Sequence, residues 1–233
     1  PKIAQLRVFG AQVIRVAADY DTTWDLCAAV AADRPWFNRN CAQNPYLVEG
    51  KKTAGLEIGE QLGEAMPEWV VLSVGDGCTI AGVVKGLEEA HAAGLCPHVP
   101  RVLGVQAAGA APLVEAFNSG AHPVISGAQT VADSLCVGHP RNPDKALDSV
   151  RRVNGAYVAV SDAEILEALP ATAATSGVFG EPAAVTAAAG VRVAVREGII
   201  DPSHGVVVLS SGNGLKDPAT ALQTVTGPTD VAA

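Results

Sequence analysis

A glycine-rich turn stands between a predicted strand and a predicted helix. The apolar run at 69–74 leads directly into five residues, Gly75, Asp76, Gly77, Cys78 and Thr79, and a helix-like stretch begins near residue 81. Glycine lets the backbone turn tightly, and the first amides of a helix lack partners within it. Backbone N–H groups and the positive end of the helix dipole therefore face one point. The turn predicts a phosphate site, although a plain strand-to-helix connection would have the same composition.

Asp76 is an unexpected residue in a phosphate-binding turn. A carboxylate about 4 Å from a phosphate charge costs on the order of 4 kcal/mol at an effective dielectric constant of 20. We therefore expect the Asp76 side chain to point away from the anion and to cap the following helix.

Four further segments support a functional interpretation of the turn. They are residues 44–53, 131–134, 179–184 and 210–218. With the turn at 75–79, they make the chain similar to threonine synthase and its close relatives over essentially its whole length. These relatives are pyridoxal-phosphate enzymes of the tryptophan-synthase-β-like fold. The most specific phrases are Asn-Pro-Tyr-Leu-Val-Glu-Gly-Lys-Lys-Thr at 44–53 and Gly-Leu-Lys-Asp-Pro at 214–218.

The resemblance implies roles for several residues around a bound pyridoxal phosphate. The amides of residues 75–79 would hold the cofactor phosphate, and Ser211 would face the pyridine nitrogen, where the family more often has threonine. Glu181 is either the cofactor-side glutamate of the family or an acid at the start of a helix. The alternative for Ser211 is a simple turn residue before Gly212.

Two further groups of residues are placed by the same resemblance. Asp133 and Ser134 are expected at the mouth of the site or at an ordinary helix start. Lys216 belongs to the closing glycine-rich turn, where we expect a salt bridge with Asp217. No metal site is indicated.

The resemblance also predicts residues that this sequence lacks. Such enzymes carry their Schiff-base lysine in a Ser-Phe-Lys-Asp-like motif and receive the substrate carboxylate in a Ser-x-Gly-Asn-like loop, and neither occurs here. None of the six lysines stands in that context: Lys2, Lys51, Lys52, Lys85, Lys145 and Lys216. The chain is therefore expected to correspond to the C-terminal portion of a longer enzyme and to be inactive alone.

The substrate prediction depends on the segment that begins at Asn44. In many threonine synthases an arginine after the Asn-Pro-x segment binds the phosphate of phosphohomoserine, and a bidentate guanidinium is difficult to replace. Leu47 stands here instead, so we expect Arg39 to supply the charge and Asn44 to contact the substrate.

Three functions remain open at this stage. One is a threonine synthase, which eliminates the γ-phosphate of O-phosphohomoserine and adds water at the β-carbon. The second is a serine or threonine ammonia-lyase or another β-elimination or β-replacement enzyme. The third is a non-catalytic fragment, or one chain of a split enzyme.

Composition narrows the class of partner. The chain has 233 residues, a formal net charge of −8 and 48% hydrophobic residues, enough to build a core. Its acidity argues against nucleic acids and anionic membranes, which require a basic face. The five cysteines form no CxxC pair, which is typical of reduced thiols in the cytoplasm. We predict a small amino-acid substrate and a homodimer, or pairing with an N-terminal segment or chain.

Short apolar strands alternate with helical patterns along the chain. This alternation predicts an open, mostly parallel sheet with helices on both faces. Residues 1–43 would be the remnant of a small mobile domain and residues 44–233 a large cofactor-binding domain. The predicted strands are 12–16, 69–74, 101–106, 157–160 and 205–210. The predicted helices are 2–9, 22–32, 51–62, 81–93, 111–118, 143–153, 163–169 and 183–197.

Overall fold

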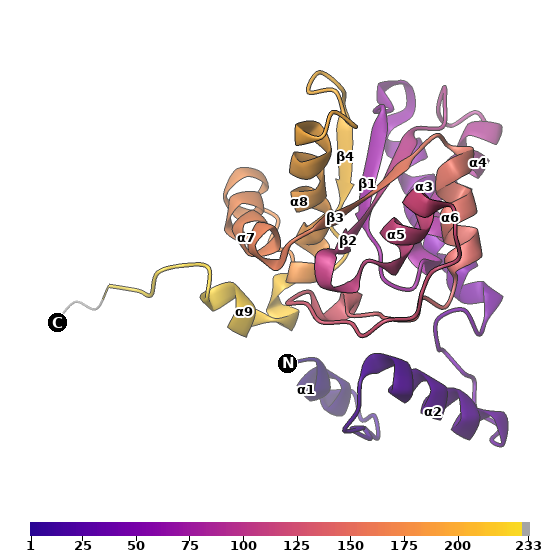
Figure 1. The fold of residues 1–233 in the computed structure, drawn as a ribbon, viewed down its shortest axis with the longest axis vertical. Helices are drawn as coiled ribbons and strands as arrows, with labels where there is room; N and C mark the ends of the chain where they lie inside the picture. The colour runs from indigo at the N-terminus through magenta and orange to yellow at the C-terminus, as the bar shows by residue number, and fades with distance from the viewer. Residues whose placement is uncertain (230–233) are drawn as a thin grey trace.

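A four-stranded sheet forms the centre of the computed structural model, which describes residues 1–229 (Figure 1). Its order is β3-β2-β1-β4. The strands are β1 (Trp69–Ser73), β2 (Arg101–Ala107), β3 (Ala156–Val160) and β4 (Val206–Leu209). Each neighbouring pair is parallel, so the carboxyl ends of the strands share one edge of the sheet. The predicted open parallel sheet is confirmed.

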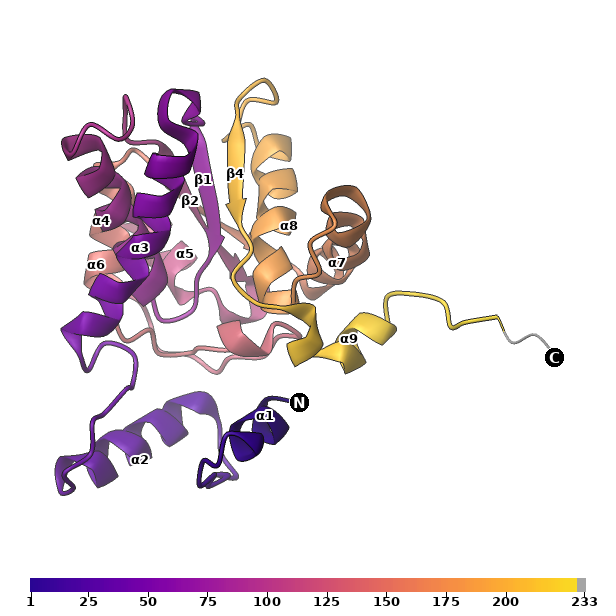
Figure 2. The same cartoon turned by 180° about the vertical axis from the view of Figure 1, so that it is seen from behind.

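Side chains of β1 alternate between two hydrophobic cores, because successive residues of a strand point to opposite faces. Val70 and Leu72 pack on the side of α4, α5 and α6, whereas Trp69 and Val71 pack on the side of α7 and α8. Helices therefore cover both faces of the sheet (Figure 2). These helices are α4 (Cys78–Ala92), α5 (Pro112–Ser119), α6 (Pro143–Arg152), α7 (Asp162–Ser176) and α8 (Pro182–Arg196).

Glycines bring α3 (Pro45–Leu62) against the outer side of α4. A Cβ atom at Gly82 of α4 would lie 2.7 Å from the carbonyl oxygen of Val48 on α3. One at Gly86 would overlap the carbonyl oxygen of Lys52. Only a residue without a side chain allows backbones to approach this closely. The glycine contact fixes α4, and with it the turn that precedes α4.

Gln106 is a fully buried polar residue of β2 that also supports this region. Its side-chain oxygen accepts hydrogen bonds from the amides of Leu113, at 2.8 Å, and Val114, at 3.1 Å. Its nitrogen donates to the carbonyl oxygen of Val74, at 3.3 Å. Gln106 thus caps α5 and holds the chain just before the glycine-rich turn.

The N-terminal segment lies beyond the carboxyl edge of the sheet (Figures 1 and 2). It contains α1 (Lys2–Val8) and α2 (Tyr20–Ala32), neither of which has a fully buried residue. The strand predicted at 12–16 is wrong, because these residues have no regular structure. A strand needs a neighbour for its backbone hydrogen bonds, and among residues 1–229 none pairs with 12–16. The domain division after residue 43 stays a prediction.

Two helix boundaries differ from the predictions by more than one helical turn. α3 begins at Pro45 rather than at residue 51, because the Asn44 side chain accepts a hydrogen bond from the Tyr46 amide and caps the helix. α7 continues through Pro170 to Ser176, where it packs against α8. The remaining helices are short: η1 (Gly63–Ala65), η2 (Ala108–Ala110), η3 (Asp133–Leu135), η4 (Gly214–Lys216) and α9 (Pro218–Leu222). Within residues 1–229, none of the helices combines the length and apolar character that crossing a membrane requires.

Replacing Ser161 by alanine is expected to lower the free energy of unfolding by about 1 kcal/mol. Ser161 Oγ accepts from the Glu164 amide, and the Glu164 carboxylate accepts from the Ser161 amide at 2.8 Å. Hydrogen bonding by that amide lowers the pKa of Glu164, and so does the Ser161 hydroxyl, which donates to the carboxylate at 2.9 Å. Alanine keeps the amide but removes the contribution of the hydroxyl. Because the pKa of Glu164 is lower in the folded chain than in the unfolded chain, its ionised carboxylate stabilises the fold at pH values above the unfolded-state pKa. This stabilisation is lost as the pH falls through the folded-state pKa.

Urea unfolding at neutral and acidic pH measures the loss of stability in Ser161→Ala and its dependence on pH. The difference between Ser161→Ala and the native chain should shrink in acid. Ser176→Ala, at the other end of α7, is the matched control and should change stability by less than about 0.5 kcal/mol. An equal loss in both variants would contradict the capping interpretation.

Candidate functional site

The glycine-rich turn connects the carboxyl end of β1 to the start of α4. Gly77 is the N-cap residue of α4 and has a φ of 86°, in the left-handed region that favours glycine. A Cβ atom there would lie 2.7 Å from Ala146 Cβ and 2.9 Å from the Asn142 carbonyl oxygen. No side chain in the described structure caps α4. Its first amides are therefore available to an anion at the helix dipole's positive end.

A cavity of about 190 Å³ opens at this turn. It brings together predicted site residues from separate parts of the sequence, with Ser73 and Ser134 beside them. The predicted residues in its wall are Gly75, Asp76, Gly77, Thr79, Glu181 and Ser211. Cys78 is buried beneath the turn. Arg39 is exposed and Asn44 caps α3, both outside the cavity wall, so their assignment to the substrate stays a prediction.

Asp76 does not cap α4, in contrast to the prediction, because Gly77 occupies the capping position. One carboxylate oxygen of Asp76 accepts a hydrogen bond from the Tyr20 hydroxyl at 2.6 Å, and the other accepts from the Arg141 amide at 3.2 Å. Burial, followed by this hydrogen bond, raises the pKa of Tyr20. The carboxylate is therefore held by groups other than the helix start.

Glu181 is a buried carboxylate between two lysines. It precedes α8 without capping it, and its oxygens lie 2.7 Å from Lys216 Nζ and 3.7 Å from Lys2 Nζ. The predicted salt bridge between Lys216 and Asp217 is wrong, since Asp217 caps α9 through Thr220. An isolated antiparallel bridge between Gly180 and Asn213 places the closing turn beside Glu181.

Serine hydroxyls mark the carboxyl ends of β1 and β4. Ser211 follows β4 and is part of the cavity wall. Ser73 Oγ is buried in that wall and has no hydrogen-bond partner in the described part of the chain. A buried hydroxyl without a partner is costly, which fits a wall built to receive a polar group.

Several supporting residues had no signal in the sequence. Arg141 stands out because its guanidinium lies 3.2 Å from both Asp21 and Asp25 of α2 and 4.2 Å from the centre of the Trp24 ring. Asn142 donates to the carbonyl oxygens of Asp76 and Gly77. The connection at 139–142 thus braces the turn and joins it to α2. These pairs are far apart in sequence, so no local periodicity could reveal them.

Comparison with known proteins bears on the cofactor of this site. Residues 1–212 match the model of the family described as pyridoxal-phosphate dependent enzyme. The chain belongs to this family. Its members depend on pyridoxal phosphate, whose phosphate group suits the uncapped start of α4 and whose ring carries polar groups that suit the serine hydroxyls of the wall.

Similar curated proteins of the family are threonine synthases. Identity is 37% to that of Methanocaldococcus jannaschii, covering 95% of this chain and 55% of the relative. It is 39% to that of Mycobacterium tuberculosis, covering 95% and 60%, and 36% to that of Methanosarcina acetivorans, covering 99% and 57%. The chain therefore spans somewhat more than half the length of these relatives.

Solved structures confirm the fold predicted from the sequence. Threonine deaminase isoform 2 of Solanum lycopersicum has a TM-score of 0.75 at 22% identity, covering 96% of this chain and 62% of that one. The L-serine ammonia-lyase of the fungus Rhizomucor miehei has a TM-score of 0.71 at 24% identity, covering 91% and 66%.

Proposed function

We propose that this chain forms the pyridoxal-phosphate-binding part of a threonine-synthase-like enzyme. Such an enzyme eliminates the γ-phosphate of O-phosphohomoserine and adds water at the β-carbon to give threonine. The observation that carries the proposal is the convergence of the turn, Glu181 and Ser211 on one cavity. The curated relatives named threonine synthase support this substrate class.

Each part of the wall has a separate task in this proposal. The amides of residues 75–79 bind the cofactor phosphate, and Ser211 offers a hydroxyl to the pyridine nitrogen. Lys216 and Lys2 pair with Glu181 beside the ring, since a buried carboxylate is costly without a cationic partner. Bound pyridoxal phosphate supplies an electron-withdrawing ring that stabilises negative charge at a substrate carbon.

An amine to anchor the cofactor is needed as well. None of the six lysines is part of the cavity wall, although Lys2, Lys51 and Lys216 contact residues of that wall. We infer that another segment or chain supplies the anchoring lysine and that this chain alone is inactive.

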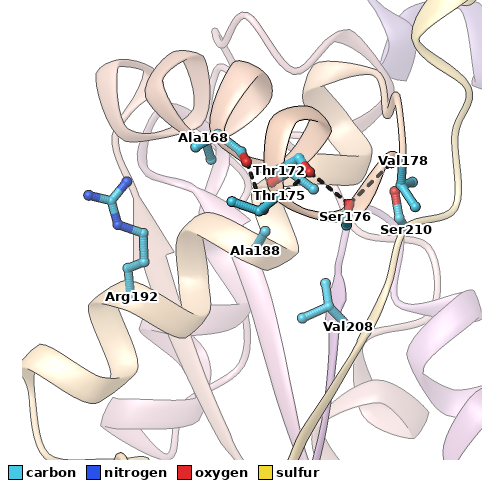
Figure 3. Close-up of a pocket in the computed structure, with 10 residues that line it drawn as sticks. Ala168, Thr172, Thr175, Ser176, Val178, Ala188, Arg192, Val208 and Ser210 are labelled. Atoms are coloured by element: carbon cyan, nitrogen blue, oxygen red, sulfur yellow. Dashed lines mark hydrogen bonds between the residues drawn. The ribbon is translucent and has the colours of Figure 1, made fainter.

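The free edge of β4 supports that inference. β4 ends the sheet on one side, and a groove of about 390 Å³ lies beside it (Figure 3). Figure 3 shows Val208 and Ser210 on one side of this groove, opposite Thr172 of α7 and Ala188 of α8. A strand added in parallel to β4 would end next to Ser211, at the cavity. A lysine-bearing strand is therefore the partner that we propose, with a homodimer through the same edge as the alternative arrangement.

Leu47 favours a second candidate function, a serine or threonine ammonia-lyase or another β-elimination or β-replacement enzyme. A substrate without a phosphate needs no arginine at this position of α3. The five free cysteines support a cytoplasmic location for either enzyme, because thiols stay reduced there.

Product analysis of the protein isolated with pyridoxal phosphate separates these functions. Threonine and inorganic phosphate released from O-phosphohomoserine in equal amounts would support the synthase. Ammonia released from threonine or serine would support the second candidate. Borohydride reduction and peptide mapping would identify the anchoring lysine, and attachment to one of the six lysines of this chain would contradict the inferred partner segment.

A further inference from the structure

Asp76 belongs to the walls of two cavities at the carboxyl edge of the sheet. One is the cavity at the glycine-rich turn, and the other, of about 680 Å³, has the start of α2 in its wall. Tyr20 is the first residue of α2, and its hydroxyl donates to the Asp76 carboxylate at 2.6 Å. This hydrogen bond joins the turn directly to the N-terminal segment.

Polar groups attach α2 to the edge of the sheet, because none of the residues 20–32 is buried. The Asp21 carboxylate accepts hydrogen bonds from the amides of Gly138 and His139, both at 3.1 Å. It also accepts one from the Arg141 guanidinium at 3.2 Å. An attachment made of hydrogen bonds, without a packed apolar core, opens at a low cost in free energy. We therefore expect α2 to exchange between a docked and a released position.

An Asp76 carboxylate without these partners would compete with a phosphate for the turn. Asp76 directly precedes Gly77, the N-cap residue of α4. Aspartate side chains readily accept hydrogen bonds from backbone amides two or three residues ahead. Those amides, of Cys78 and Thr79, are among the ones that we propose to bind the cofactor phosphate. A carboxylate placed there would also repel the phosphate by its charge.

We propose that Tyr20 is a positioning residue that couples the docking of α2 to the binding of a phosphate at the turn. This inference rests on the proposed function, because it concerns the same phosphate site. With α2 docked, the Tyr20 hydroxyl holds the Asp76 carboxylate away from the turn amides. With α2 released, the carboxylate occupies those amides and closes the site. The coupling is reciprocal, so a bound phosphate keeps α2 docked.

Affinity for pyridoxal phosphate, measured by equilibrium dialysis, tests the coupling in one direction. Tyr20→Phe removes the hydroxyl and keeps the ring, so we expect about a tenfold loss of affinity, the size of one hydrogen bond to a charged group. Tyr46→Phe is the matched control, since Tyr46 is an exposed tyrosine at the start of α3. It should bind pyridoxal phosphate as the native chain does. Circular dichroism verifies the folding of each variant.

A second substitution separates this role from a purely structural one. Asp76→Asn removes the charge that the Tyr20 hydroxyl holds, so adding Tyr20→Phe to it should change the affinity by less than about twofold. A tenfold loss from Tyr20→Phe in both backgrounds would overturn the proposal. Weaker binding by folded Asp76→Asn than by the native chain would overturn it as well, because the carboxylate would then aid binding instead of competing with it.

Hydrogen exchange of the α2 amides tests the coupling in the other direction. Saturating pyridoxal phosphate should slow the exchange of residues 20–32 about fivefold in the native chain and leave it unchanged in Tyr20→Phe. Exchange in α7 should be the same with and without the cofactor. Equal exchange of α2 in the free and the bound native chain would overturn the proposal.

Failure of this inference differs from failure of the proposed function. A native chain that binds neither pyridoxal phosphate nor inorganic phosphate would overturn both. A native chain that binds pyridoxal phosphate, together with a Tyr20→Phe variant of equal affinity, would overturn the coupling alone.

Discussion

Gly77→Val is expected to lower the affinity for pyridoxal phosphate by about 100-fold, as measured by equilibrium dialysis. A valine cannot adopt the left-handed φ of 86° without strain, and its Cβ would collide with Ala146 and with the Asn142 carbonyl. The turn must move, and the amides that we propose to bind the phosphate lose their alignment. Two lost hydrogen bonds to a charged group, at roughly 1.5 kcal/mol each, correspond to a factor of about 100.

Gly198→Val is the matched control for this change. Gly198 follows α8, at the opposite edge of the sheet, with a φ of 72°, and a Cβ atom added to it would meet no other atom within 4 Å. The variant should lose stability from backbone strain, about 1–2 kcal/mol, and keep its cofactor affinity. An equal loss of affinity in both variants would assign the effect to general destabilisation. Unchanged affinity in Gly77→Val would remove the turn from the site.

Gly86→Val is expected to lower the free energy of unfolding by about 3 kcal/mol, measured by urea denaturation. Its side chain would overlap the Lys52 carbonyl, and a backbone atom cannot move aside as the tip of a flexible side chain can. α3 and α4 must therefore separate along their contact. Because α4 begins at the glycine-rich turn, cofactor affinity should fall as well.

Gly50→Val provides the comparison on α3. Gly50 is exposed, and a Cβ atom at this position would have no neighbouring atom within 4 Å. It should change stability by no more than about 0.5 kcal/mol. A loss in Gly86→Val no larger than in Gly50→Val would show that the two helices tolerate a side chain between them.

The strands and the glycine-rich turn could be predicted because the signals for each lie in consecutive residues. Apolar residues from Trp69 to Val74 required a strand buried on both faces, and the glycines after it required a tight turn. The sequence did not show that the Asn44 side chain caps α3, since a capping motif and a binding motif use the same residue types; its contact with the substrate stays a prediction.

Patterns in consecutive residues do not predict contacts between segments that are far apart in sequence. The pairing of Lys216 with Glu181 depends on a bridge between two loops, and the position of Arg141 depends on α2 crossing the carboxyl edge of the sheet. The strand expected at 12–16 had the right composition, but within residues 1–229 no strand lies beside it to share backbone hydrogen bonds. Each of these three features depends on how distant segments are arranged in the fold.

The strand order has a consequence for how the chain folds. β1, β2 and β3 are adjacent in the sheet in the order in which they are synthesised, so each can pair as it emerges. β4 pairs with β1 although β1 ends at Ser73 and β4 begins at Val206. Until β4 arrives, β1 presents an open edge to any other chain nearby, and closing so long a loop is slow. Aggregation during synthesis is therefore expected to begin at β1, which becomes an inner strand of the complete sheet.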